Sequence, residues 1–169
     1  NENIPYEVEM KKALEKYVHN FNHINTYFIC FKKLNNDYEF NNNVLYLNGN
    51  ESRIPGILDK TIRSLFILTK NNDYDYILRG NISTVINLQK LTTLLSNNKI
   101  KNIYAGGLLF TVDWVEKNSQ HFGLRFASGT NIIIDRIALI FLLENIKKDY
   151  YKIIDDVAIG EVFRKNVNI

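Results

Sequence analysis

The sequence predicts a single α/β domain over residues 1–169, with a mostly parallel central sheet flanked by helices. A length of 169 residues suits one domain that can bury its own core. Segments with helical spacing alternate along the chain with short apolar runs. Strands that are covered on both faces read as such continuous runs, which favours a parallel sheet between two layers of helices.

Five helices are expected where apolar residues recur three or four positions apart. In the first of them, Pro5 suits the first turn of a helix, and Met10, Leu14 and Tyr17 follow at helical spacing. The five helices are expected at residues 5–21, 57–70, 87–96, 137–147 and 157–165.

Apolar and aromatic runs predict the strands. They are expected at residues 26–31, 44–47 and 76–78 and within 100–110, with 76–78 as an inner strand of the sheet. Residues 34–43 and 112–126 are expected to be irregular, the second as a loop over a site. A nucleotide-binding α/β sheet normally begins with a strand, whereas this chain opens on a helix, so its first strand is either missing or replaced.

Charge and composition exclude some partners. The net charge of +3 is too small to indicate nucleic acid or an anionic membrane. No apolar stretch reaches the roughly 18 residues that a membrane span needs, and Asn1-Glu2-Asn3 lacks the basic start of a signal peptide. The one cysteine, Cys30, lies in an apolar run and cannot form an internal disulfide. A reducing compartment is therefore allowed, and we expect a cytoplasmic location.

Three segments hold the residue types that chemistry needs. Residues 73–87 form a strand, a polar turn and a helix start in succession, and residues 126–130 form a small-residue turn before an apolar segment. The pair Asp155 and Asp156 stands at the start of a predicted helix. The helix dipole favours carboxylates at this position, so a structural role is the alternative to a catalytic one.

These segments resemble the β-1,3-glycosyltransferases related to the galactosyltransferase and Fringe families, which have the GT-A fold. Five matches occur in the family's order, over roughly residues 44–163: Lys60-Thr61, Tyr74 to Asn87, Tyr104-Ala105-Gly106, Ser128-Gly129-Thr130 and Asp155 to Gly160. The resemblance implies a GT-A-like (Rossmann-like) domain. It also implies an inverting transfer of a sugar from a nucleotide-sugar donor to a hydroxyl of a carbohydrate acceptor.

The resemblance implies a role for the paired carboxylates. Asp156 matches the family's general base, which takes the proton from the attacking hydroxyl. Asp155 is then expected to hydrogen-bond nearby or to cap the helix. The remaining site residues are expected to contact the donor (Arg79, Asn81, Ser83 and Lys60) or the acceptor (Ser128, Gly129 and Trp114). The alternatives are fixing of the turn or an exposed ion pair for Arg79, a solvated face for Lys60 with Arg63, and core packing for Trp114.

One departure from the family affects its metal. The family's acidic triplet, which holds a divalent cation against the donor diphosphate, aligns with Asn81-Ile82-Ser83. Mg²⁺ and Mn²⁺ prefer carboxylate oxygens, so we expect no metal or other cofactor. The alternative is Mn²⁺ or Mg²⁺ bound with the donor through other residues, such as Asp75 or Asp113.

Two readings of function follow from this departure. The first is a metal-independent glycosyltransferase. The second is a catalytically silent GT-A-like module that binds carbohydrate or nucleotide sugar, or serves a neighbouring catalytic domain. An unrelated α/β nucleotide-binding protein is a third.

Overall fold

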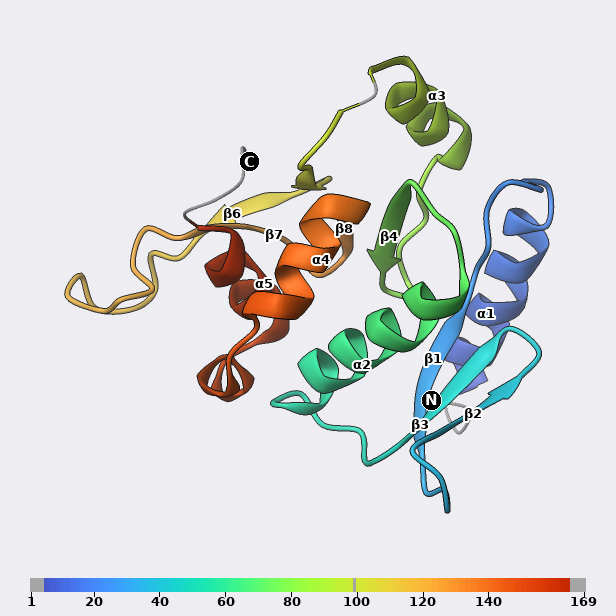
Figure 1. Ribbon diagram of the computed structural model, residues 1–169, viewed down its shortest axis with the longest axis horizontal. Coiled ribbons are helices and arrows are strands. Elements are labelled where there is room, and N and C mark those ends of the chain that lie inside the picture. The colour runs from blue at the N-terminus through green and yellow to red at the C-terminus, as the bar shows by residue number, and fades with distance from the viewer. Residues whose placement is uncertain (1–4, 99, 165–169) are drawn as a thin grey trace. The chain divides into compact units, whose positions relative to one another are not determined.

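The computed structural model describes residues 5–98 and 100–164 (Figure 1). The contacts within the chain divide it into two compact units. Unit 1 comprises residues 1–51 and 82–85, and unit 2 comprises residues 52–81 and 86–169. The expectation of one glycosyltransferase domain over residues 1–169 stays a prediction beside this division.

Unit 1 contains one helix and a three-stranded sheet. The helix α1 spans Pro5–Val18. The strands β1 (Phe28–Lys32), β2 (Tyr38–Asn41) and β3 (Val44–Asn48) lie in the order β1-β3-β2. The middle strand β3 pairs in parallel with β1 and antiparallel with β2, and its first four residues are buried.

The strand β2 falls in a segment that was expected to be irregular. All four of its residues are exposed, so no buried apolar pattern marks them in the sequence. The two-residue turn from β2 to β3 is made by Asn42 and Asn43, and Asn42 has a φ of 52°. Asparagine tolerates this left-handed conformation better than most residues, which explains why the turn is rich in asparagine.

Unit 2 contains the remaining elements. Its helices are α2 (Gly56–Asn71), α3 (Leu88–Asn98), α4 (Arg136–Asn145) and α5 (Asp155–Phe163), with a short 3-10 helix η1 at Lys148–Lys152. The strands β4 (Tyr76–Gly80), β8 (Asn131–Asp135) and β5 (Tyr104–Gly106) form an antiparallel sheet in that order. A two-stranded ribbon joins β6 (Leu109–Thr111) to β7 (Arg125–Ala127).

The core of unit 2 forms between this sheet and the helices α2, α4 and α5. Its buried apolar side chains come from all four: Leu58, Ile62 and Leu65 of α2, Tyr104, Ile132 and Ile134 of the sheet, Ala138, Leu139 and Leu142 of α4, and Ala158, Ile159, Val162 and Phe163 of α5. A second buried cluster joins Val112, Leu124 and Phe126 to Val157 of α5. Helix α5 therefore contributes to both clusters.

The prediction of a large, mostly parallel central sheet is wrong. The sheets are small, with three, three and two strands, and among the described strands only β1 and β3 pair in parallel. The main cause is β8, which was missed because residues 132–143 read as one apolar run. This run holds a strand and then a helix, and β8 runs antiparallel to both of its neighbours. Residues 76–78 are not an inner strand either, since β4 lies at the edge of its sheet.

The five predicted helices are confirmed, with different ends. The helix α1 ends at Val18 rather than at residue 21, and α5 begins at Asp155 rather than at 157. The predicted last residue, 165, lies outside the described residues. Within the described residues, none of the helices has the length and apolar character needed to cross a membrane.

Candidate functional site

An ion pair joins β4 to the start of α5. Arg79 lies near the end of β4, and Asp155 is the first residue of α5. Arg79 Nη2 donates to Asp155 Oδ2 at 2.6 Å, and Arg79 Nη1 donates to the carbonyl oxygen of Gly129. The side chains of Arg79 and Asp155 are only 17% and 13% exposed, so water screens this pair far less than a surface pair. One guanidinium thus ties a strand, a turn and a helix together.

The neighbouring carboxylate, Asp156, is held by the same turn. The backbone N–H of Gly129 donates to Asp156 Oδ2 at 3.2 Å, and the N–H of Val157 donates to Asp156 Oδ1 at 3.0 Å. The side chain is half-buried, so solvent still reaches it. Each carboxylate oxygen accepts one backbone hydrogen bond and retains a second acceptor site for a ligand.

The turn at residues 128–130 also reaches the end of β4. The N–H of Asn81 donates to the carbonyl oxygen of Thr130 at 3.3 Å. Within the turn, the buried hydroxyl of Ser128 accepts from the backbone N–H and the hydroxyl of Thr130, both at 3.3 Å. The turn is therefore hydrogen-bonded to Asn81 on one side and to Asp156 on the other.

Small residues let these segments approach closely. A Cβ on Gly129 would lie 2.5 Å from Arg79 Nη1, and a Cβ on Gly160 would lie 2.6 Å from the Cβ of Phe126. Only glycine allows α5 to lie this close to β7. This contact brings the first turn of α5, with its two carboxylates, against the turn that follows β7.

Burial sets the protonation behaviour of Asp156. Burial raises the pKa of the Asp156 carboxyl above its usual range, and the nearby Asp155 carboxylate raises it further. The backbone N–H groups of Gly129 and Val157 and the guanidinium of Arg79 act in the opposite direction without cancelling the rise. A carboxylate with a raised pKa is a stronger base than an ordinary surface aspartate.

The structure brings together most of the residues that were predicted to form the site. Arg79, Ser128, Gly129, Asp155 and Asp156 form one hydrogen-bonded cluster in unit 2, which Asn81 joins through its backbone. Asp155 was expected either to hydrogen-bond nearby or to cap the helix, and the first of these alternatives is the one observed. The N-cap of α5 is Ile154, which makes no side-chain cap bond, and Asp155 contacts Arg79 instead.

The other predicted residues lie elsewhere in the molecule. Ser83 belongs to unit 1, a different unit from the one that holds the cluster. Lys60 is half-buried on α2. Trp114 follows β6 and is 58% exposed, so the alternative of core packing does not apply to it.

Two polar contacts of this region were missed in the sequence. The N–H of Ala127 donates to the buried hydroxyl of Tyr104 at 3.0 Å, and burial raises the pKa of that phenol far above its usual value. His121 Nδ1 lies 2.7 Å from Glu161 Oε1, which attaches the loop after β6 to α5. The partners are 23 and 40 positions apart, so no local pattern reveals either contact.

The residues aligned with the family's metal-binding triplet do not suit a hard divalent cation. The side chains of Asn81 and Ser83 offer only neutral oxygens, and that of Ile82 offers none. Residues 5–98 and 100–164 contain no group of three or more acidic, histidine or cysteine side chains placed to hold a metal ion. His19 and His23 are four positions apart, a spacing that would place two metal ligands on one face of a helix. They do not share a helix face, because α1 ends at Val18.

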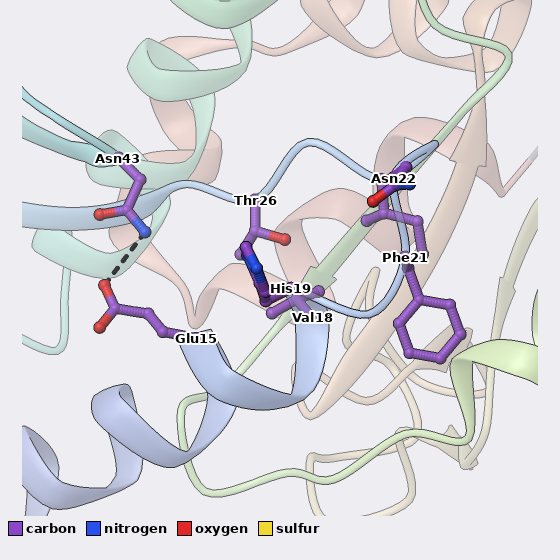
Figure 2. Close-up of a pocket in the computed structure, with 8 residues that line it drawn as sticks. Glu15, Val18, His19, Phe21, Asn22, Thr26 and Asn43 are labelled. Atoms are coloured by element: carbon purple, nitrogen blue, oxygen red, sulfur yellow. Dashed lines mark hydrogen bonds between the residues drawn. The ribbon is translucent and has the colours of Figure 1, made fainter.

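No residue of the cluster lines either of two hollows in the molecule. The larger, of about 350 Å³, is in unit 1, where Figure 2 shows Asn43 turned toward Glu15, to which it donates at 3.0 Å. The smaller, of about 200 Å³, is lined by residues 123–125 and Arg164 of unit 2. Asn81 lines neither of them, and its expected contact with the donor stays a prediction.

Comparison with known proteins does not assign the chain to a family. No protein-family model matches the chain, and no characterised protein gives a significant match. The resemblance to the β-1,3-glycosyltransferases therefore depends on the five segments alone.

Proposed function

We propose that this chain is an inverting glycosyltransferase that moves a sugar from a nucleotide-sugar donor to a hydroxyl group of a carbohydrate acceptor. One observation carries the proposal. Arg79, Gly129, Asp155 and Asp156 come from three of the segments that resemble the family, and hydrogen bonds hold them in one cluster. Arg79 is 50 positions from Gly129 and 76 from Asp155.

Asp156 is the general base in this proposal. The acceptor hydroxyl attacks the anomeric carbon of the donor, the bond from that carbon to the diphosphate oxygen breaks, and the hydroxyl proton passes to Asp156. An inverting transfer needs only one carboxylate, because no covalent intermediate forms. The raised pKa and the partial exposure of Asp156 support this role.

Asp155 and Arg79 hold Asp156 in place. Asp155 already pairs with the Arg79 guanidinium at 2.6 Å, so its carboxylate is engaged in holding the cluster together. The two Nη atoms of Arg79 donate to Asp155 and to the carbonyl oxygen of Gly129. We therefore assign Arg79 to positioning the turn that binds Asp156, in place of direct contact with the donor diphosphate.

A catalytically silent binding module is the second candidate function. One observation favours it, namely that the negative donor diphosphate has no evident counter-charge in the cluster. Positions 81–83 have no carboxylate to hold a cation, and the guanidinium of Arg79 is paired with Asp155. Such a module would bind nucleotide sugar or carbohydrate without transfer.

The test combines ligand binding with turnover. Thermal-shift measurements with UDP, GDP, CMP and their sugars identify a donor, and release of the nucleotide in the presence of glycan acceptors then measures transfer. We expect Asp156→Asn to keep the melting temperature shift caused by the donor and to lower transfer by roughly 10² or more, the usual worth of a positioned base. Asp149→Asn is the matched control, because Asp149 pairs with Lys152 on the surface and is 82% exposed.

Each outcome separates the two candidates. Donor binding with the expected loss in Asp156→Asn supports the transferase. Full transfer in Asp156→Asn removes the base assignment. Binding of a nucleotide sugar or glycan without any transfer by the unchanged chain favours the silent module, and no shift with any nucleotide or sugar contradicts both.

A further inference from the structure

We infer that two exposed aromatic side chains, Phe110 and Trp114, form a platform that binds a neutral pyranose ring of the acceptor glycan; this inference rests on the proposed function. Phe110 of β6 is 48% exposed, and Trp114 in the loop after β6 is 58% exposed. Large aromatic side chains exposed together on a surface indicate a binding site more often than an isolated one does.

A buried ring supports both exposed rings. The ring of Phe126, on the paired strand β7, is 3% exposed, and its centroid lies 6.0 Å from the centroids of both Phe110 and Trp114. The ring of Trp114 meets it edge-on at 84°, and the ring of Phe110 is tilted by 32°. Contacts of this kind stabilise aromatic pairs and keep the exposed rings ordered, which reduces the entropy that a ligand must remove.

The platform is continuous with the carboxylate cluster. Gly129 is three positions after Phe126, a span of at most about 10 Å of extended chain, and Gly129 binds Asp156. The N–H of Ser128 donates to the carbonyl oxygen of Leu108 at 2.9 Å, which joins the start of β6 to the same turn. Val157, the residue after Asp156, packs in the buried cluster that contains Phe126.

The chemistry of this surface selects a sugar ring. Carbohydrate sites combine aromatic surface, which covers the C–H face of a pyranose, with a few polar groups that bind its hydroxyls. Here the aromatic surface is provided by Phe110 and Trp114, and a polar group by the carboxylate of Asp156. Because an acidic sugar would bring a second negative charge toward Asp156, the platform favours a neutral one.

The test uses Trp114 as its own reporter, since it is the only tryptophan in the sequence. The full chain is titrated with lactose as a neutral probe, with 3′-sialyllactose as an acidic one, and with glycerol as a polyol that has no ring. We expect lactose to change the Trp114 emission saturably, 3′-sialyllactose to bind more weakly, and glycerol to have no effect.

Two variants separate the platform from the rest of the molecule. Phe110→Ala should weaken lactose binding about tenfold, which corresponds to the loss of one aromatic contact. Phe66→Ala is the matched control, because Phe66 is a 52% exposed phenylalanine on α2, and it should leave binding unchanged. Circular dichroism of each variant checks that it is folded.

Turnover distinguishes this inference from the proposed function. In the transfer assay, Phe110→Ala and Trp114→Ala should raise the acceptor KM about tenfold and leave the donor KM unchanged. If lactose binds saturably but no donor supports transfer, the proposed transferase function is contradicted and the platform is supported. Normal transfer with an unchanged acceptor KM in both variants overturns the platform and keeps the transferase. A third result would also overturn the glycan as occupant. If Trp114 emission changes with protein concentration and not with sugar, and sedimentation shows a dimer that Phe110→Ala loses, the platform binds a second copy of the chain.

Discussion

Arg79 Nη2 and Asp155 Oδ2 lie 2.6 Å apart, although 76 positions separate the two residues in the sequence. The same guanidinium binds the carbonyl of Gly129, whose N–H binds Asp156. The position of the proposed base is thus linked to Arg79 on β4 by two successive hydrogen bonds through Gly129. Changes at Arg79 should therefore affect Asp156 without touching it.

Arg79→Lys should destabilise unit 2 even though it keeps the positive charge. A lysine ammonium cannot reproduce the two directed hydrogen bonds that the planar guanidinium makes to Asp155 and Gly129. We expect a loss of about 2 kcal/mol, the usual worth of one hydrogen bond to a charged group, seen as a fall in the melting temperature of about 4–8 °C.

The matched control for this variant is Arg136→Lys. Arg136 makes an ion pair with Asp73 at 2.7 Å, but the two side chains are 59% and 94% exposed. Exposed ion pairs contribute little to stability, so this variant should have the same melting temperature as the unchanged chain. Equal melting temperatures for Arg79→Lys and the unchanged chain would show that the buried pair has no special role.

Gly129→Ala should disturb the ion pair between Arg79 and Asp155 by adding a methyl group at the turn that contacts it. The added Cβ would lie 2.5 Å from Arg79 Nη1 and 3.5 Å from Asp155 Oδ2, so the guanidinium must move. We expect a loss of about 1–3 kcal/mol, which is typical of overpacking. Gly80→Ala provides the comparison, because its Cβ meets only the carbonyl oxygen of Thr130, at 3.3 Å. Chemical denaturation of both variants tests the order, and a smaller effect for Gly129→Ala would contradict it.

The element types could be predicted from the sequence because helical spacing is a local property. The spacing that begins at Pro5, for example, predicts α1 to within three residues of its end at Val18. The direction of the strands was not predictable in this way. β8 shares one apolar run with α4, and only its pairing with β4 and β5 shows that it is an antiparallel strand.

The candidate site likewise has features that the sequence predicts and features that it does not. The segments that contribute Arg79, Gly129 and Asp156 stood out in the sequence, because each has an unusual composition. Their contacts could not be read from it: a nearby hydrogen bond was one of two alternatives for Asp155, but its partner, Arg79, was not identified. The contact between His121 and Glu161 has no signal at all, because the two residues are 40 positions apart and each is ordinary by itself.

Added divalent metal should change donor binding little. Positions 81–83 present no carboxylate, and hard cations bind neutral oxygens weakly. The measurement is calorimetry with UDP, or with whichever nucleotide shifts the melting temperature, in Mn²⁺, in Mg²⁺ and in EDTA. We expect the same Kd in all three. Loss of binding in EDTA would contradict this, and would direct attention to the exposed carboxylates Asp75 and Asp113 as ligands.

The stability of the chain should depend on pH through Asp156. Burial raises the pKa of this carboxyl in the folded protein above its unfolded value, so the folded protein binds the proton more tightly. The stabilisation from that proton is fully present below the unfolded pKa of about 4, and it is lost as the pH rises through the folded pKa. Over that interval the unchanged chain should lose stability relative to Asp156→Asn, which carries no titrating group there.

Melting temperatures of the unchanged chain and of Asp156→Asn, measured from about pH 4 to neutral pH, test this dependence. We expect the difference in favour of Asp156→Asn to grow as the pH rises. Asp155→Asn should behave in the opposite way at neutral pH, because it leaves the largely buried Arg79 without its charged partner, at a cost of about 3 kcal/mol. A constant difference between the unchanged chain and Asp156→Asn would mean that the pKa of Asp156 is not raised on folding. The argument that burial makes Asp156 a stronger base than an ordinary surface aspartate would then fail, even if the cluster that holds it stayed intact.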